Sequence, residues 1–383
     1  MALMLITKTD FRLPRDGGAL RTSEVVRVLS SAGHSVSAFV AKPSSHQGTS
    51  SRVAGFALIM ANLKVLRRVL GCASLTVAKW YSPSMIKSIV AARPTQKWNG
   101  TIIEYSQLAI YRDIVPGPVL IDMHNIESEL MRNYQKSASG WLRRMAALWE
   151  SRRLARLESS MVNFASAITF VSQRDLDVFR ILAKSKLDRN EVQLAVAPNG
   201  VAEEGFRWTG TRQPNVVFVA HLGWQPNIDA ATWLVEKVWA QVVAAVPHAR
   251  LQLVGRSPHP SVLRLTSDTV QVFADVESVI PFTGSAAVAT APLLASGGTR
   301  LKIMEAMSCG TPVVSTSLGA LGLESKAGHG LVIADDPGDF AKALVDMLTS
   351  SPSEDTVRSA VLDMKWDSTL TSLVDTANEK LGV

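Results

Sequence analysis

The sequence has few cysteines, and this argues against a disulfide framework and against a zinc site. Cys72 and Cys309 are the two cysteines among 383 residues, and they form neither a CxxC pair nor a Cys/His cluster. No disulfide framework and no zinc site is therefore indicated. A cytoplasmic location, in a reducing compartment, is the expectation that follows.

Long apolar runs are also missing. The longest weakly polar stretch, VAGFALIMANL at 53–63, is shorter than the roughly 18 apolar residues that cross a bilayer. We expect it to form a helix that is buried or lies on an interface. The N-terminus, MALMLITKTDFRLPRDGG, has no charged n-region and no small-residue cleavage site, so no secretion signal is predicted.

What is present is the composition of a folded protein with an uneven charge. Hydrophobic residues make up 47% and charged residues 19%, which excludes disordered and collagen-like classes, and the length suits two domains. Residues 1–199 hold 27 Lys and Arg against 14 Asp and Glu, whereas residues 200–383 hold 13 against 19. A basic first half indicates an anionic substrate or surface, or else an uneven but solvated surface. No nucleic-acid recognition motif accompanies it, so nucleic acid is not expected.

Short apolar runs that alternate with helical patterns predict an α/β fold twice over. Their hydrophobicity is continuous rather than alternating, which is typical of parallel sheets covered on both faces. The predicted strands are 2–7, 35–41, 101–106, 119–125 and 167–172 in a first set, and 216–222, 250–255, 270–276, 286–293 and 311–316 in a second. Residues 196–215, rich in Gly, Pro and Asn, are the expected linker, with the boundary near Gly200.

Ligands of such sheets bind beyond the carboxyl ends of the strands. Three segments take that position: Gly17 and Gly18 after the first strand, His124 and Asn125 at the end of VLIDMHN, and 296–299 after AAVATAPL.

The stretch SGGTRLKIMEAMSCG, residues 296–310, predicts an anion site at a helix start. Glycines let a ligand approach the backbone, and the first turn offers unpaired N–H groups and the positive end of the helix dipole. Lys302 and Glu305 share one face, and Gly310 ends the helix. A cation beside a phosphate and a carboxylate one turn further suit a nucleotide diphosphate. The alternative is a surface Lys/Glu pair on an ordinary amphipathic helix.

Residues 296–316, together with VVFVAHLGWQPNIDAATWLVEKVW at 216–239 and VAPNGV at 196–201, resemble the retaining GT-B glycosyltransferases of family 4, or group 1. The resemblance covers nearly the whole chain and is stronger in the second half. It implies two doubly wound, Rossmann-like domains that face each other across a cleft. Residues 1–200 would bind the acceptor, and residues 201–383 would bind the nucleotide sugar. The resemblance also allows the last helix to cross back to the first domain.

The resemblance also implies roles for individual residues. Glu305 matches the glutamate that binds the donor ribose, Arg300 and Lys302 match basic positions near the diphosphate, and His124 resembles the histidine that contacts the transferred sugar. The remaining donor-binding positions are Gly17, Gly18, Val276, Gly298 and Thr299.

Two departures from the family pattern stand out. Gly297 occupies the position of a second glutamate that contacts sugar hydroxyls in many relatives. Ala220 and His221 replace the glycine and the basic residue common in FVGRL segments, so the role of that basic residue would pass to Arg300 and Lys302.

The activity expected from the resemblance is a retaining hexosyl transfer from a nucleotide diphosphate sugar, as co-substrate, to an acceptor hydroxyl. The acceptor would be a polysaccharide, a natural product or a lipid-linked molecule. A nucleotide-sugar hydrolase or epimerase of GT-B type, or a non-catalytic nucleotide-binding partner subunit, remain alternatives. No cofactor is expected. No metal is expected either, because His124 and Glu127 are too few ligands to hold an ion. The glycine loop lacks G-x-G-x-x-G spacing, which argues against hydride transfer.

Two features also have a purely structural explanation. His124 could be a structural histidine that satisfies backbone groups at a strand end. The segment GWLRRMAALWESRRLARLESSM, 140–161, fits either a basic interfacial helix that docks on an anionic membrane or an ordinary basic helix.

Overall fold

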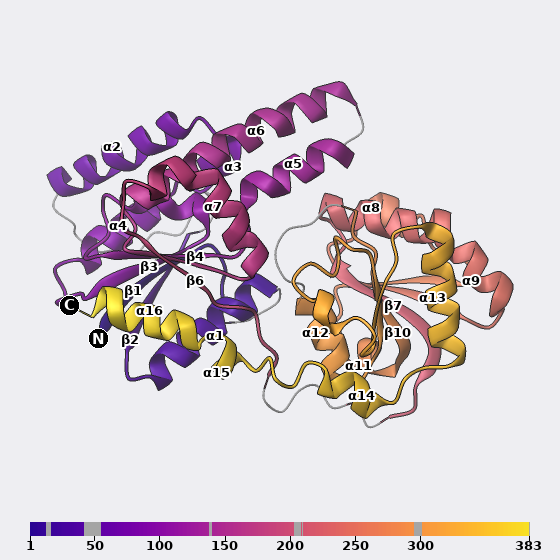
Figure 1. The fold of residues 1–383 in the computed structure, drawn as a ribbon. Coiled ribbons are helices and arrows are strands. Elements are labelled where there is room, and N and C mark those ends of the chain that lie inside the picture. Colours follow the sequence, from indigo (N-terminus) through magenta and orange to yellow (C-terminus); the bar gives the residue numbers. More distant parts are fainter. Residues whose placement is uncertain are drawn as a thin grey trace. The chain divides into compact units, whose positions relative to one another are not determined.

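The chain forms two compact units. The computed structural model describes residues 1–12, 17–41, 55–137, 140–202, 208, 210–294 and 301–382. Unit 1 comprises Met1–Pro198 and Thr369–Val383, and unit 2 comprises Asn199–Ser368. The chain therefore leaves unit 1 close to Gly200, where the sequence indicates a linker, and its last residues return to unit 1 (Figure 1).

Unit 1 is built on a parallel six-stranded sheet in the order β2-β1-β3-β4-β5-β6. Each neighbouring pair is parallel, as the continuous apolar runs predict. The strands are β1 (Ala2–Thr7), β2 (Ser35–Val40), β3 (Gly100–Glu104), β4 (Val119–Met123), β5 (Ala167–Phe170) and β6 (Gln193–Val196).

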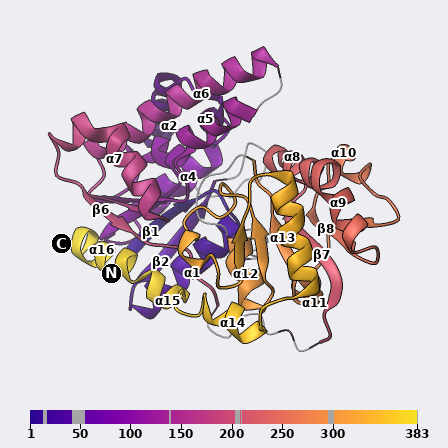
Figure 2. The ribbon, with the colours of Figure 1, turned by 45° about the vertical axis from the view of Figure 1, so that its right-hand side comes forward.

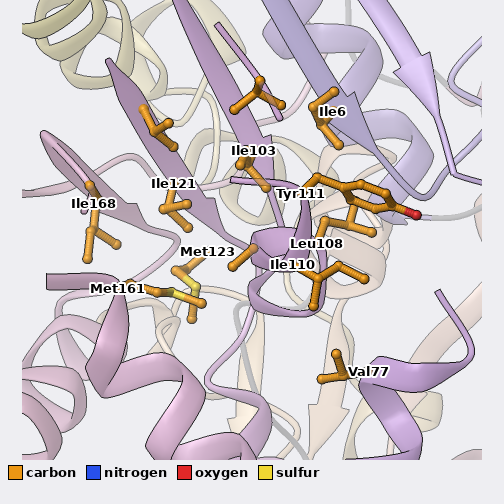
Figure 3. Close-up of a cluster of buried hydrophobic side chains, with 14 of the residues drawn as sticks. Ile6, Val77, Ile103, Leu108, Ile110, Tyr111, Ile121, Met123, Met161 and Ile168 are labelled. Atoms are coloured by element: carbon orange, nitrogen blue, oxygen red, sulfur yellow. The ribbon is translucent and has the colours of Figure 1, made fainter. Parts of the chain in front are cut away.

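Helices cover this sheet and bury its apolar side chains. Figure 3 shows isoleucines of β1, β3, β4 and β5 packed against the 3₁₀ segment that carries Leu108, Ile110 and Tyr111. The helical elements of unit 1 are α1 (Gly17–Ser31), α2 (Gly55–Cys72), α3 (Leu75–Ala78), α4 (Pro83–Ala92), η1 (Ser106–Tyr111), α5 (Glu127–Ser137), α6 (Trp141–Ser160), η2 (Met161–Asn163), α7 (Gln173–Leu187) and α16 (Thr371–Leu381).

Unit 2 repeats the architecture with the order β12-β11-β10-β7-β8-β9, again with all neighbours parallel. Its strands are β7 (Gln213–His221), β8 (Arg250–Arg256), β9 (Val270–Ala274), β10 (Ala286–Ala291), β11 (Val313–Ser315) and β12 (Leu331–Ile333).

Two buried apolar clusters lie on unit 2's sheet, as parallel strands covered on both faces require. The helical elements are α8 (Gln225–Trp233), the π-helical η3 (Leu234–Trp239), α9 (Ala240–Ala245), α10 (Pro260–Leu263), α11 (Ile280–Ser285), α12 (Leu301–Ser308), η4 (Glu324–Lys326), α13 (Pro337–Thr349), α14 (Glu354–Ser359) and α15 (Trp366–Thr369), which crosses into unit 1. No described helix is both long enough and apolar enough to cross a membrane.

The strand orders place one switch point in each sheet. In unit 1 the connections from β1 run toward β2 on one side, and those from β3 run toward β4, β5 and β6 on the other. In unit 2 the same reversal falls between β7 and β10. Ligands of open parallel sheets bind at the carboxyl edge of such a reversal. The helices that follow β1 and β10 are α1 and α12, which carry candidate residues of each unit.

Candidate functional site

Four charged side chains converge at the switch point of unit 1. Arg21 lies in the second turn of α1, Glu104 ends β3, Asp122 lies near the end of β4, and His124 follows that strand. All four are buried, with at most 8% of His124 exposed. Burial of so many ionised groups is tolerated only when the charges are paired.

Arg21 and Asp122 form the central ion pair. Arg21 Nε donates to Asp122 Oδ2 at 3.0 Å and Nη2 donates to Oδ1 at 2.9 Å, which is a two-pronged contact. The Thr169 hydroxyl on β5 donates to Asp122 Oδ1 at 2.7 Å. Burial raises the pKa of Asp122, but the Arg21 charge and His124 outweigh it and hold that pKa far below the ordinary value. Asp122 is therefore an anion.

His124 lies against two carboxylates. Its Nε2 is 3.5 Å from Asp122 Oδ2 and 3.7 Å from Glu104 Oε1. Burial lowers the pKa of His124, yet the hydrogen bonding and charge of the two carboxylates prevail, so the pKa is raised. The two neighbouring carboxylates thus favour the protonated imidazolium over the neutral ring.

The residues around His124 fix its position. The Tyr105 ring packs on the imidazole with centroids 3.9 Å apart, and Lys8 Nζ lies 3.7 Å from the Tyr105 centroid. Tyr105 has a positive φ of 67°, which is rare for a bulky side chain and marks a strained turn after β3. Thr22 in α1 donates to Glu104 Oε2 at 2.6 Å and so holds the second carboxylate.

Glu104, Asp122 and His124 also have the composition of a metal site. They offer ligand atoms that all lie within 4.8 Å of one another, whereas the sequence suggested no third ligand near His124 and Glu127. Both oxygens of Asp122, however, already accept hydrogen bonds from Arg21, whose buried charge would repel a divalent cation. We interpret the cluster as an ion network, and independence of metal stays a prediction.

In unit 2, α12 carries Lys302 and Glu305 one turn apart, as the sequence predicts. Lys302 Nζ lies 4.9 Å from the Phe218 ring centroid of β7, across the switch point. Lys302, Glu305 and Thr283 line a cavity of about 40 Å³, together with Val219, Val279, Ile280 and Cys309. Burial raises the pKa of Glu305, and Lys302 opposes that rise. Gly310, with φ 78°, terminates this segment as expected.

The loops after β8 and β9 lie at the same carboxyl edge of the unit 2 sheet. Ser257 and Asp275 both have positive φ, 48° and 53°, and Asp275 Oδ1 accepts a hydrogen bond from the Ser257 amide at 2.9 Å. Val276 follows this turn and, like Val219, packs against the buried cluster that includes Val217 and Val254. Among the described residues, three of the four non-glycine positions with positive φ therefore lie at the carboxyl ends of strands, where ligands of this fold class bind, and the fourth, Ala73, follows α2.

Arg212 holds the far side of α12 in place. Its guanidinium donates to the Gly284 and Ala286 carbonyls, both at 2.9 Å, and to the carbonyl of Cys309 at 3.0 Å. It also pairs with Glu354 at 2.7 Å. One side chain thereby ties β10, the end of α12 and α14 together.

The predicted site residues divide between the two units and a segment outside the described residues. Gly17 and Gly18 are the first residues of α1 itself rather than of a preceding loop, and the Gly18 carbonyl accepts from Thr22 at 3.0 Å. Gly297, Gly298, Thr299 and Arg300 fall outside the described residues. His221 is exposed, and its carbonyl accepts from the Asn227 amide.

Sequence reasoning missed Arg21, Glu104 and Asp122. The two carboxylates were visible as charged residues near the ends of otherwise apolar strands, TIIEYS and VLIDMHN. That pattern should be interpreted as a site or a buried ion pair, because an unpaired charge is rarely buried. Arg21 carried no such indication, since one arginine in an amphipathic helix is normally solvated.

Comparison with known proteins finds a family similarity for part of unit 2. Residues 213–350 match the model of the glycosyl transferases group 1 family. A curated relative from Klebsiella pneumoniae, an uncharacterized 44.6 kDa protein in the cps region, is 27% identical over 143 residues, which are 34% of this chain and 36% of the relative. The aligned region is thus about a third of either protein.

Two solved structures share the fold over the full length. Sucrose-phosphate synthase from Thermosynechococcus elongatus has a TM-score of 0.69 at 16% identity, with 99% of this chain and 98% of that chain covered. The UDP-forming α,α-trehalose-phosphate synthase from Burkholderia vietnamiensis has a TM-score of 0.63 at 12% identity, with both chains fully covered. The chain therefore has a GT-B fold with two Rossmann-like units, and residues 213–350 of unit 2 are similar to the group 1 glycosyl transferases.

Proposed function

We propose that the protein is a retaining hexosyltransferase that moves a sugar from a nucleotide diphosphate sugar to an acceptor hydroxyl. The observation that carries this proposal is the group 1 match over residues 213–350, which includes α12 with Lys302 and Glu305. The name of one fold relative, a UDP-forming synthase, favours a nucleotide diphosphate donor. As in the sequence analysis, the acceptor is a polysaccharide, a natural product or a lipid-linked molecule.

In this proposal unit 2 binds the nucleotide. Glu305 accepts hydrogen bonds from the ribose hydroxyls, and the backbone at Val276 reads the base. The amides of Gly298 and Thr299 reach the phosphate and sugar, and Arg300 and Lys302 neutralise the diphosphate. The present cavity beside Glu305, about 40 Å³, holds roughly one water molecule, so α12 or its neighbours must adjust to admit a ribose.

We propose that His124 contacts the sugar that is transferred and that Gly17 and Gly18 lie near the diphosphate. The bond between the anomeric carbon and the diphosphate oxygen breaks, the acceptor oxygen bonds to the same face of that carbon, and the leaving phosphate oxygen takes the acceptor proton. Negative charge grows on the leaving group, and fixed cations stabilise it more in the transition state than in the ground state. His124, whose pKa Asp122 and Glu104 raise, is suited to position the sugar beside that charge.

No metal is needed in this scheme, because Arg300 and Lys302 supply the positive charge that a metal ion otherwise provides. Both cysteines are free, which accords with the proposed reducing, cytoplasmic compartment.

Donor turnover with and without acceptors tests the proposal. Nucleotide sugars are first screened for the one that raises the melting temperature most. That donor is then incubated with candidate acceptors, and the anomeric proton coupling of the product is compared with that of the donor by NMR. Acceptor-dependent release of nucleotide diphosphate with retained configuration supports the proposal. Release without acceptor indicates the hydrolase or epimerase, and binding without turnover under any acceptor indicates the non-catalytic subunit.

A further inference from the structure

Three helices of unit 1, α2, α5 and α6, form an outer layer with an unusual surface. α6 packs against both α5 and α2, and the three lie together in both views (Figures 1 and 2). We call this layer the α2–α6 face. Every ionisable side chain that is exposed on these three helices is basic: Lys64, Arg67, Arg68, Arg132, Lys136, Arg143, Arg144, Arg152 and Arg156.

The acidic side chains of α6 point inward instead, and Glu129 on α5, which is partly buried, pairs with Arg174 on α7 at 2.6 Å. Glu150 on α6 accepts from the Ser74 hydroxyl at 2.7 Å and so holds the start of α3. Glu158, also on α6, accepts from the Glu127 amide at 2.7 Å and from the Ser128 hydroxyl at the start of α5. Because both carboxylates of α6 are used inside the unit, the charged groups that α6 exposes to solvent are all cations.

The same face exposes large apolar side chains. On α6, Trp141, Met145 and Trp149 follow a four-residue spacing along one side, and 72%, 57% and 41% of them are exposed. Arg152 and Arg156 continue that side of the helix. The stripe therefore changes from aromatic and apolar to basic along its length.

α2 has a second apolar stripe, opposite to its buried one. Its buried side chains include Val65 and Val69, which pack in the core of unit 1. Its exposed stripe consists of Ile59, Leu63, Leu66 and Leu70. A surface helix of a soluble protein normally exposes its polar side, so this stripe needs a partner.

We propose that the α2–α6 face docks on an anionic lipid bilayer. Interfacial helices combine basic residues with Trp and Leu, so that the apolar groups enter the acyl boundary and the cations meet the headgroups. Arginine stems can lie on the apolar surface while their charged ends stay in the headgroup layer. The inference goes beyond sugar transfer and does not depend on it.

The charges of the chain favour this partner over two others. No aspartate or glutamate occurs from residue 25 to residue 103, a segment that includes α2, α3 and α4 as well as residues 42–54, which lie outside the described part. A second copy of the same face would bring cation against cation. Nucleic acid would neutralise the cations but would leave the leucines and isoleucine of α2 in water.

Vesicle flotation of the full chain tests the proposal without any nucleotide sugar present. Vesicles of phosphatidylcholine alone are compared with vesicles that contain 30% phosphatidylglycerol, at low and at high salt. We expect flotation with the anionic vesicles, at least about tenfold weaker binding to the neutral ones, and weakening by salt. Each arginine near an anionic surface contributes about fivefold in affinity.

Two variants and one control separate the contributions. Trp141→Gln with Met145→Gln removes apolar contacts, and Arg143→Gln, Arg144→Gln, Arg152→Gln and Arg156→Gln together should weaken binding to anionic vesicles by several hundredfold, about fivefold for each arginine. The control changes the same kinds of exposed residue on and just after α7, with Ile181→Gln, Lys184→Gln and Arg189→Gln. Circular dichroism melting confirms that each variant is folded.

Equal flotation with both vesicle types, flotation with neither, or equal loss in the α7 control would overturn the proposal. If the protein does not bind vesicles but forms a dimer that the α6 variants abolish, the face binds a second copy of the chain. If the protein binds an oligonucleotide but not vesicles, the face binds nucleic acid. Because flotation uses no donor, its outcome is independent of whether the protein transfers sugar.

Discussion

Asp122→Asn is the most informative change in the unit 1 cluster. The substitution keeps the size of the side chain but removes its charge, and so leaves Arg21 buried without its anion. Unit 1 also contains a second Arg–Asp pair with the same two-pronged geometry. Arg68 contacts Asp113 at 2.6 and 3.0 Å, with 42% of the Arg68 side chain and 29% of the Asp113 side chain exposed. Asp113→Asn is therefore a control matched in chemistry and different in burial.

The structure predicts very different losses of stability for the two variants. Breaking a buried ion pair by removing one partner costs about 3–5 kcal/mol, because the remaining charge is uncompensated. An exposed pair contributes about 0–1 kcal/mol. With about 1.4 kcal/mol per factor of ten, Asp122→Asn should increase the opening equilibrium of unit 1 by about two to three and a half orders of magnitude, and Asp113→Asn by about fivefold or less.

Hydrogen exchange measured by mass spectrometry can resolve this difference within unit 1. Peptides that cover β4, Val119–Met123, report the opening of the central sheet, and their exchange rates scale with the opening equilibrium when closing is fast. Peptides from β7 and β8 of unit 2 serve as the internal reference. If the β4 rates of the two variants agree within about threefold, the argument that Arg21 depends on Asp122 is wrong.

The same variant changes the protonation of His124. A raised pKa means that the protonated His124 stabilises the folded state fully below its ordinary value of 6.5, and that this contribution is lost as pH rises through the higher folded value. Asp122→Asn removes one of the two carboxylates that raise the pKa, so the transition moves to lower pH. NMR titration of ¹³C-labelled histidine measures this shift, and an unchanged His124 titration would contradict the geometry.

Three further predictions concern the proposed reaction. Glu305→Gln should weaken nucleotide diphosphate binding severely, because Glu305 is the proposed ribose ligand; unchanged affinity in calorimetry would remove that assignment. His124→Ala should lower kcat on the order of a hundredfold while product affinity changes little; a lower melting temperature with intact turnover would show a structural histidine instead. EDTA should leave sugar transfer unchanged, and loss of activity that magnesium or manganese restores would contradict the proposal that Arg300 and Lys302 replace a metal ion.

Most of the sheet architecture follows from the sequence because parallel strands buried on both faces are continuous apolar runs. Ten of the strands were predicted in this way, and β6 and β12 were not. β6 is QLAV, all of it only partly buried at a sheet edge, and its last residue fell within the expected linker. β12 has three residues, too few for a pattern.

The candidate site was predictable only in part, for a physical reason. Lys302 and Glu305 lie one turn apart, so local spacing already places them on one face. Arg21, Glu104 and Asp122 come together through the order of the sheet, and Arg21 and Asp122 are 101 positions apart in the sequence. No local period of the sequence encodes such a contact, and charge within an apolar strand is the one available indication.

The return of the chain to unit 1 determines the order in which that unit can be completed. α16 buries Leu373, Ala377 and Leu381 and packs against β4, β5 and β6, yet it is translated after all of unit 2. At about 5–20 residues per second, synthesis of residues 199–368 takes on the order of ten to thirty seconds. Throughout that time the surface that α16 covers has no helix to bury it, so unit 1 cannot be completed until all of unit 2 has been synthesised.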